Sequence, residues 1–287
     1  MRIINQLDEA YQLFRAARTD GGVCGLVPTM GALHEGHLRL VEKGRSECDL
    51  LAVSIFVNAM QFNDKGDHER YPRTVQEDLD LLAARGVDMV ILPSDQEMHP
   101  EPIQFQVVPS GLSEGLEGAS RPGHFAGVAT VVMKLFHVLS EGRAYFGEKD
   151  FQQLAVIKRM VVEFHLPIEV VGVAIVREPD GLAMSSRNRL LSEQERAAAP
   201  ALYKSIEALR RGYSTGERRV QNLIQLAKDE LAREPLFKLD YLEVVNPATL
   251  DLLEFADDDS RIVVAANIGR VRLIDNSPVG AQDAEER

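Results

Sequence analysis

Short apolar runs alternate with helical patterns along the first 176 residues. The runs at 24–30, 49–57, 87–93, 143–147 and 168–176 are almost continuously apolar, and each predicts a strand. They lack the polar alternation of a half-exposed strand, so they are typical of a parallel sheet whose two faces are both covered. The sequence therefore predicts a buried parallel sheet in this part of the chain.

The segments between these runs have the periodicity of helices. We expect helices at 74–86, 124–140 and 150–164. Thr74 and Glu77 have the spacing of a capping box, and Gly86 is a suitable end for the first of these helices. Strand and helix in alternation predict an α/β fold with a doubly wound, Rossmann-like parallel sheet.

The pattern changes after Val176. A polar, turn-rich stretch leads to Ser192 and Glu195, a second capping-box pair that predicts a long helix. A further helix near 218–233 and strands at 240–245, 261–268 and 271–274 follow, and the tail from Gly280 is expected to fray. The prediction is a Rossmann-like domain at 1–175 and a smaller C-terminal α+β domain at 176–287.

Composition restricts the class of partner. The formal net charge is −12 and the basic residues form no stripe, which argues against binding to nucleic-acid backbones. Cys24 and Cys48 have no metal-ligand spacing and suit a reducing compartment. The N-terminus lacks the pattern of a signal peptide and no apolar run approaches a membrane span, so a cytoplasmic protein is expected.

The stretch "PTMGALHEGH" places His34 and His37 directly after the first long apolar run. A metal site is disfavoured because no third ligand has suitable spacing. Two interpretations stay open: incidental histidines at a helix start, or a site for nucleotide phosphates. Gly31 and Gly36 favour the second, since small residues let the backbone of a helix N-terminus approach an anion.

Three further polar stretches follow predicted strands or approach helices. Asn58 and Gln61 offer amides suited to hydroxyl and carboxylate groups, or form an ordinary polar loop. Lys149 and Asp150, with Gln153 beyond them, are either a surface ion pair or phosphate and ribose contacts. In "LAMSSRN", two serines and an arginine suit a polyphosphate or form a simple turn.

Together these stretches resemble one family, the pantothenate synthetases (pantoate–β-alanine ligases) of the HxGH nucleotidyltransferase superfamily. The matching motifs occur in family order from about residue 26 to 276 and are "VPTMGALHEGH", "SIFVNAMQF", "RYPRT", "GLEGASRPGHFAGVATVVMKLF", "FGEKDFQQL", "DGLAMSSRN" and "RLIDN". Each motif is weakly or moderately specific, whereas seven in order are very specific.

The resemblance implies a reaction and its substrates. The family activates pantoate with ATP as pantoyl adenylate, releasing pyrophosphate, and β-alanine then displaces AMP. It also implies a homodimer with no nucleic-acid or membrane partner, a C-terminal domain that acts as a lid, and Mg²⁺ bound mainly through the ATP phosphates, with Asp150 as a candidate ligand.

The resemblance also assigns residues. The catalytic set is His37, His34, Lys149 and Arg187, and the pantoate and β-alanine set is Asn58, Gln61 and Gln153. The ATP-binding set is Met30, Gly31, Ala32, Leu33, His34, Glu35, Gly36, His37, Gly147, Glu148, Lys149, Asp150, Val176, Met184, Ser185, Ser186 and Arg187.

One position departs from the family pattern. Ala59 stands where the family has proline, in "FVNAMQF". Proline would restrict the backbone between Asn58 and Gln61, so alanine is expected to weaken binding of pantoate or to slow adenylation without abolishing activity. Two rivals share the first motif: a nucleotidyltransferase that leaves AMP on its product, and a non-catalytic ATP-binding protein.

Overall fold

The computed structural model describes residues 1–63 and 65–280, and the chain forms two units. Unit 1 comprises residues 1–148 and 152–173, and unit 2 comprises residues 149–151 together with the chain from Ala174 onward. The predicted frayed tail, apart from Gly280, lies outside the described residues.

Unit 1 contains a six-stranded sheet in which every pairing is parallel. Its strands, in spatial order, are β1 (Arg2–Ile4), β4 (Met89–Ile91), β3 (Leu50–Ile55), β2 (Cys24–Thr29), β5 (Gly142–Gly147) and β6 (Ile168–Val173). The predicted doubly wound sheet and its five strands are confirmed. β1 was not predicted, because it has only three residues and two of them are exposed.

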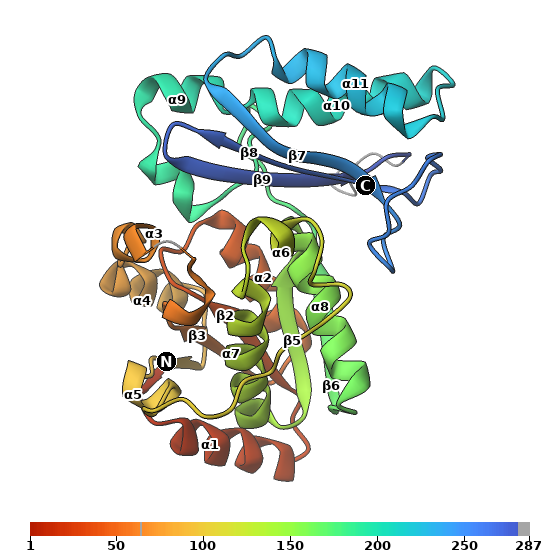
Figure 1. Ribbon diagram of the computed structural model, residues 1–287. Helices are drawn as coiled ribbons and strands as arrows, with labels where there is room; N and C mark the ends of the chain where they lie inside the picture. Colours follow the sequence, from red (N-terminus) through yellow and green to blue (C-terminus); the bar gives the residue numbers. More distant parts are fainter. Residues whose placement is uncertain (64, 281–287) are drawn as a thin grey trace. The chain divides into compact units, whose positions relative to one another are not determined.

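Helices connect these strands (Figure 1). They are α1 (Leu7–Thr19), α2 (Glu35–Glu47), η1 (Ala59–Gln61), α3 (Lys65–Arg70), α4 (Val75–Ala84), α5 (Asp95–Met98), α6 (Glu117–Ser120), α7 (His124–Leu139), η2 (Glu148–Asp150) and α8 (Phe151–Glu163).

Side chains of the sheet alternate between two cores. On β5, Ala144 and Phe146 join a core that includes most of the buried face of α7, whereas Tyr145 joins a second core with residues of α2 and α4. Successive side chains of a strand point to opposite faces, so strands that are apolar at every position need a helical layer on each side. This explains why the strand segments are continuous apolar runs in the sequence.

The order in which successive strands are added to the sheet reverses between β2 and β5. From β2 it passes to β3 and β4, and it then returns to form β5 on the other side of β2. In parallel α/β sheets ligands bind beyond the carboxyl ends of the strands at such a reversal. The loops that follow β2 and β5 are therefore the first place to look for a site.

Unit 2 contains a three-stranded antiparallel sheet of β7 (Phe237–Val245), β8 (Arg261–Ile268) and β9 (Val271–Pro278). Its helices are η3 (Ser186–Leu190), α9 (Glu193–Ala198), α10 (Ala201–Ser214) and α11 (Val220–Leu231). Helices α10 and α11 pack against each other and against this sheet (Figure 1). The predicted α+β character of this segment is confirmed.

The long helix expected after Ser192 is wrong in its length. The capping box of Ser192 and Glu195 is present, with both reciprocal hydrogen bonds, but α9 ends at Ala198 and α10 begins after Pro200. Proline has no N–H for the helical hydrogen-bond ladder, and its ring crowds the preceding turn, so the helix is interrupted there.

Candidate active site

The loop after β2 has an unusual backbone. Gly31 and Ala32 are buried, and both have a positive φ, of 77° and 50° respectively. A residue with a Cβ is strained in this region, so Ala32 keeps this conformation only because its surroundings hold it there.

Asp78 of α4 supplies that support. Its side chain is 1% exposed, and its two oxygens accept hydrogen bonds from the N–H groups of Ala32 (2.9 Å) and Leu33 (2.8 Å). The hydroxyl of Thr74 also donates to this carboxylate, at 3.2 Å. The capping box predicted for Thr74 and Glu77 is therefore wrong, because Thr74 makes no side-chain cap bond and is turned toward Asp78.

His34 and His37 form the N-terminal cap of α2. The N–H of Gly36 donates to Nδ1 of His34 (3.2 Å), and the N–H of His34 donates to Nδ1 of His37 (3.4 Å). The two ring centroids lie 4.1 Å apart. A backbone N–H can only donate, so both Nδ1 atoms are acceptors, and each neutral ring carries its proton on Nε2. This pair is thus a built cap whose Nε2–H groups can donate to an oxygen.

Asn58 and Gln61 bracket the 3₁₀ helix η1, which follows β3. Asn58 donates from Nδ2 to Oε1 of Gln61 (3.1 Å) and to the carbonyl of Gly127 (3.0 Å). The Gln61 side chain then reaches Sδ of Met30, which lies 3.2 Å from its Nε2. Met30 directly follows β2, so the ends of two neighbouring strands come together here.

Residues at the end of α6 and the start of α7 hold η1. His124 donates from Nδ1 to the carbonyl of Gln61 (2.8 Å), and Arg121 donates to the same oxygen (3.1 Å). A Cβ on Gly127 would lie 2.6 Å from the backbone of Met60, so only glycine allows this approach. His124 lies 63 positions from Gln61, so no local sequence pattern predicts this contact.

Gly147 ends β5, which neighbours β2, and η2 follows it directly. The carbonyl of Lys149 accepts a hydrogen bond from Nδ2 of Asn276 (2.8 Å), within unit 2, and Asp150 is exposed. In α8, Gln152 is buried and holds the 112–117 segment through the carbonyls of Leu112 and Gly115 and the N–H of Glu117.

Gln153, the residue assigned by the resemblance, is half-buried and shows no side-chain hydrogen bond to the described residues. The side chain of Gln152 is therefore committed to the fold, whereas that of Gln153 is not. Adjacent helical positions differ by about 100° in direction, which separates the two roles.

The remaining assigned residues share one loop of unit 2. The N–H of Met184 donates to the carbonyl of Val176 (2.9 Å), so the two ends of this loop are brought together. Ser185 caps η3 by accepting from the N–H of Arg187 (3.3 Å), and Ser186 is buried.

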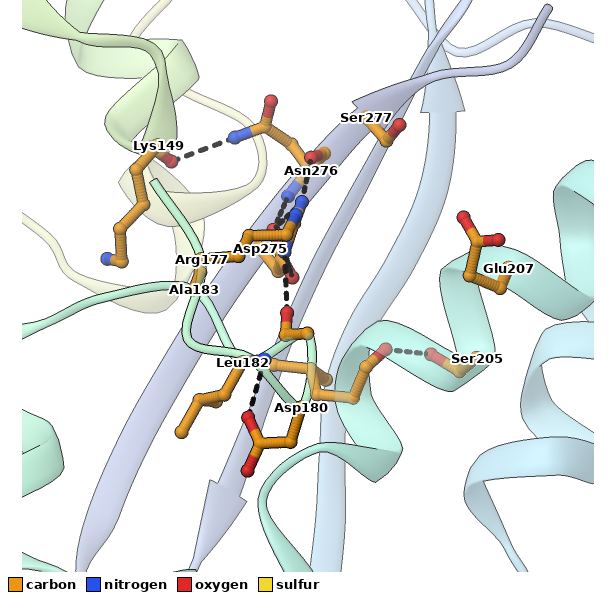
Figure 2. A network of polar contacts seen from close by, with 12 residues as sticks. Lys149, Arg177, Asp180, Leu182, Ala183, Ser205, Glu207, Asp275, Asn276 and Ser277 are labelled. Carbon is orange, nitrogen blue, oxygen red and sulfur yellow. Dashed lines mark hydrogen bonds and ion pairs between the residues drawn. The ribbon is translucent and has the colours of Figure 1, made fainter. Parts of the chain in front are cut away.

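A buried ion pair anchors this loop to β9. Arg177 forms a two-bond pair with Asp275, at 2.7 Å and 3.0 Å (Figure 2). Nη1 of Arg177 also donates to the carbonyl of Gly181. Burial raises the pKa of Asp275, while the Arg177 charge opposes that rise. Asp275 is only 3% exposed, so separating the pair would leave a buried charge uncompensated, and the loop is held firmly to the strand.

The structure therefore brings most of the assigned residues together in two groups. In unit 1, the stretches 30–37, 58–61 and Gly147 follow β2, β3 and β5, three neighbouring strands whose carboxyl ends share one edge of the sheet. In unit 2, Val176 and residues 184–187 share one loop, and Lys149 lies against β9 through Asn276. Among the described residues no group of three His, Cys, Asp or Glu side chains is arranged for a metal ion, and no helix could cross a membrane.

Fold and site together define a class of protein. It is a Rossmann-like α/β protein in which a capped helix N-terminus, suited to binding an anion, lies at the reversal point of the sheet. Comparison with known proteins is more specific. A family profile described as Pantoate-beta-alanine ligase matches residues 2–278. The chain belongs to this family, and it is a ligase that forms a C–N bond.

Individual relatives are similar to this chain over nearly its whole length. Pantothenate synthetase of Pelobacter propionicus is 48% identical over 98% of this chain and 99% of its own length. The crystal structure of pantothenate synthetase from Thermus thermophilus has a TM-score of 0.93 and 44% identity, covering 98% of this chain and all of that one. A Francisella tularensis pantoate-beta-alanine ligase, complexed with beta-gamma ATP and beta-alanine, has a TM-score of 0.81 and 33% identity over 98% of this chain and 99% of that one.

Proposed function

We propose that this ligase uses ATP to join pantoate to β-alanine through a pantoyl-adenylate intermediate. The observation that carries the proposal is the His34–His37 cap, which places a helix N-terminus with two imidazole rings directly after the strand at the reversal point of the sheet. The ATP and β-alanine complex of the Francisella relative supports the same choice of substrates.

In the first step an oxygen of the pantoate carboxylate attacks the α-phosphorus of ATP. A P–O bond forms to pantoate, and the bond from the α-phosphorus to the bridging oxygen breaks, releasing pyrophosphate. Negative charge increases on the phosphate oxygens, and the histidine Nε2–H groups and the helix N-terminus stabilise it. Lys149 and Arg187 neutralise further phosphate charge.

In the second step the neutral amine of β-alanine attacks the acyl carbon of the adenylate. The C–N bond of pantothenate forms, the C–O bond to AMP breaks, and the nitrogen loses a proton. Gln61 and Gln153 hold pantoate through its oxygens, and Asn58 belongs to the same set. No covalent enzyme nucleophile is needed in either step.

The assignments that accompany this mechanism are proposals as well. The remaining ATP contacts are those of Met30–Gly36, Gly147–Asp150, Val176 and Met184–Ser186. Mg²⁺ is bound mainly through the phosphates, with Asp150 as the candidate protein ligand; an ion brought by the nucleotide suits a chain whose described residues offer no three-ligand cluster. A cytoplasmic homodimer whose residues 176–287 act as a lid completes the proposal.

Oxygen labelling tests the mechanism. With pantoate labelled in its carboxylate with ¹⁸O, the adenylate route transfers one labelled oxygen to AMP and leaves the other in pantothenate. Unlabelled AMP, formed together with pantothenate, would contradict the proposal. A final product that retains AMP would instead identify the rival nucleotidyltransferase.

A further inference from the structure

A chain of largely buried polar side chains leads from α7 to Gln61. Nζ of Lys134 lies 3.3 Å from Nδ1 of His99, and Nε2 of His99 lies 2.9 Å from Oδ1 of Asn58. Asn58 in turn contacts Oε1 of Gln61, at 3.1 Å. His99 directly follows α5, so residues from three parts of unit 1 meet in this chain.

Two backbone groups favour one orientation of the Asn58 amide. The N–H of Met60 donates to Oδ1 (3.3 Å), and the carbonyl of Gly127 accepts from Nδ2 (3.0 Å). Neither backbone group can exchange its role. Oδ1 is therefore the acceptor end of Asn58, which requires His99 to donate from Nε2.

Lys134 fixes the same direction from the opposite end. An ammonium group has donors only, so Nδ1 of His99 must accept, and the neutral ring then carries its proton on Nε2. Lys134 is itself held by a hydrogen bond to the carbonyl of Met98. Asn58 and Lys134, on the two sides of His99, therefore both require its Nε2–H tautomer.

The surroundings favour the neutral form of His99. The charged groups that act on it are Lys134 of α7 and Asp95 of α5, and the ring of Phe56 lies 5.7 Å from its own. Burial, followed by the charge of Lys134, lowers the pKa of His99, and Asp95 opposes this. Burial also lowers the pKa of Lys134. A protonated His99 would have no acceptor to offer Lys134, so the chain depends on the neutral ring.

We propose that Lys134 and His99 are positioning residues that orient the Gln61 amide, so that its NH₂ group serves as the donor to a substrate oxygen. Gln61 accepts from Asn58 through Oε1, which leaves Nε2 at Met30 Sδ, a weak acceptor that a carboxylate or hydroxyl oxygen readily replaces. In this arrangement Asn58 acts through Gln61. The inference rests on the proposed function, because it names pantoate as the source of that oxygen.

Kinetics of Lys134→Met test the positioning role. Without the donor, His99 can also carry its proton on Nδ1, and its Nε2 lone pair then faces Oδ1 of Asn58. That repulsion favours reversal of the Asn58 amide against its two backbone bonds, and Gln61 then presents its carbonyl to the pantoate carboxylate. We expect KM for pantoate to rise about tenfold, with KM for ATP and kcat within about twofold. Lys134→Arg, which keeps a donor-only group, should restore KM, and Lys158→Met, an exposed lysine on α8, should match the wild type.

A pH profile adds a readout that a merely structural role would not move. Lys134→Met removes a charge that lowers the pKa of His99, so the acid limb of kcat/KM for pantoate should shift to higher pH. If Lys134→Met instead lowers kcat and thermal stability while KM for pantoate and the pH profile stay unchanged, the proposal is overturned.

Imidazole ¹⁵N NMR tests the chain without any assay of activity. The wild-type protein should show His99 as the neutral Nε2–H form at pH 7, and Lys134→Met should populate the Nδ1–H form. A wild-type Nδ1–H or charged ring would overturn the inference even if pantothenate is formed. Conversely, a correct tautomer in a protein that forms no pantothenate would contradict the proposed function and leave the polar chain established.

Discussion

Replacing Asp78 with asparagine removes one of the two carboxylate oxygens that hold the loop after β2. Those oxygens accept from Ala32 N (2.9 Å) and Leu33 N (2.8 Å), so in either orientation of the new amide one buried N–H faces an NH₂ group. Losing a charge-assisted hydrogen bond and leaving its donor unsatisfied costs about 2–3 kcal/mol. The positive φ of Ala32, 50°, offsets part of this loss, because the strained backbone is then free to relax and the loop moves.

The loss should appear in two measurements. Urea unfolding of Asp78→Asn should show a free energy of unfolding lower by about 2 kcal/mol. Relaxation of the loop moves the His34 cap, so KM for ATP should rise about tenfold. Asp80→Asn is the matched control, since Asp80 is exposed on the same helix and bonds only to Gln76 among the described residues. If Asp78→Asn and Asp80→Asn are indistinguishable in both measurements, the clamp does not hold the loop.

Three further predictions concern η1 and its surroundings. Ala59→Pro should raise the free energy of unfolding by about 0.5–1 kcal/mol and lower KM for pantoate. The reason is that Asn58 already has an extended backbone suited to a following proline (φ −78°, ψ 102°). No kinetic change would refute the role given to Ala59. Gly127→Ala should lower the free energy of unfolding in urea by about 1–2 kcal/mol. The alanine Cβ would lie 2.6 Å from the Met60 backbone, and this clash outweighs the better helix propensity of alanine. A gain in stability would refute that contact. The free energy of unfolding should fall as pH falls below 6.5, the ordinary pKa of histidine. Because the pKa of His99 is lowered in the folded protein, the unfolded chain binds a proton there that the folded chain does not. The free energy of unfolding of His99→Gln should fall less steeply with pH, and an identical fall would exclude His99 as the source.

The sheet could be predicted because burial on both faces leaves a direct trace in the sequence. Strands such as β3 need apolar side chains at nearly every position, and their connections need helices. β1 left no such trace, because it is short and mostly exposed. Pro200 could have predicted the division between α9 and α10, but the capping box at Ser192 marks only a helix start and says nothing of its length.

Candidate site residues could be predicted where they are neighbours in the sequence, whereas contacts between distant positions could not. His34 and His37 lie within one turn, so their spacing was visible. Asp78 lies 46 positions from Ala32, and no local pattern links the two. One signal was present: Asp78 precedes the buried Leu82 by four residues, which places a charge on the buried face of α4.

Exchange of labelled pyrophosphate into ATP, with Mg²⁺ present and β-alanine absent, tests the central claim most directly. Reversible adenylate formation predicts exchange that requires pantoate and that falls in variants of His34 and His37. Pantothenate formation upon addition of β-alanine, without any pantoate-dependent exchange beforehand, would contradict an adenylate that forms ahead of the amine.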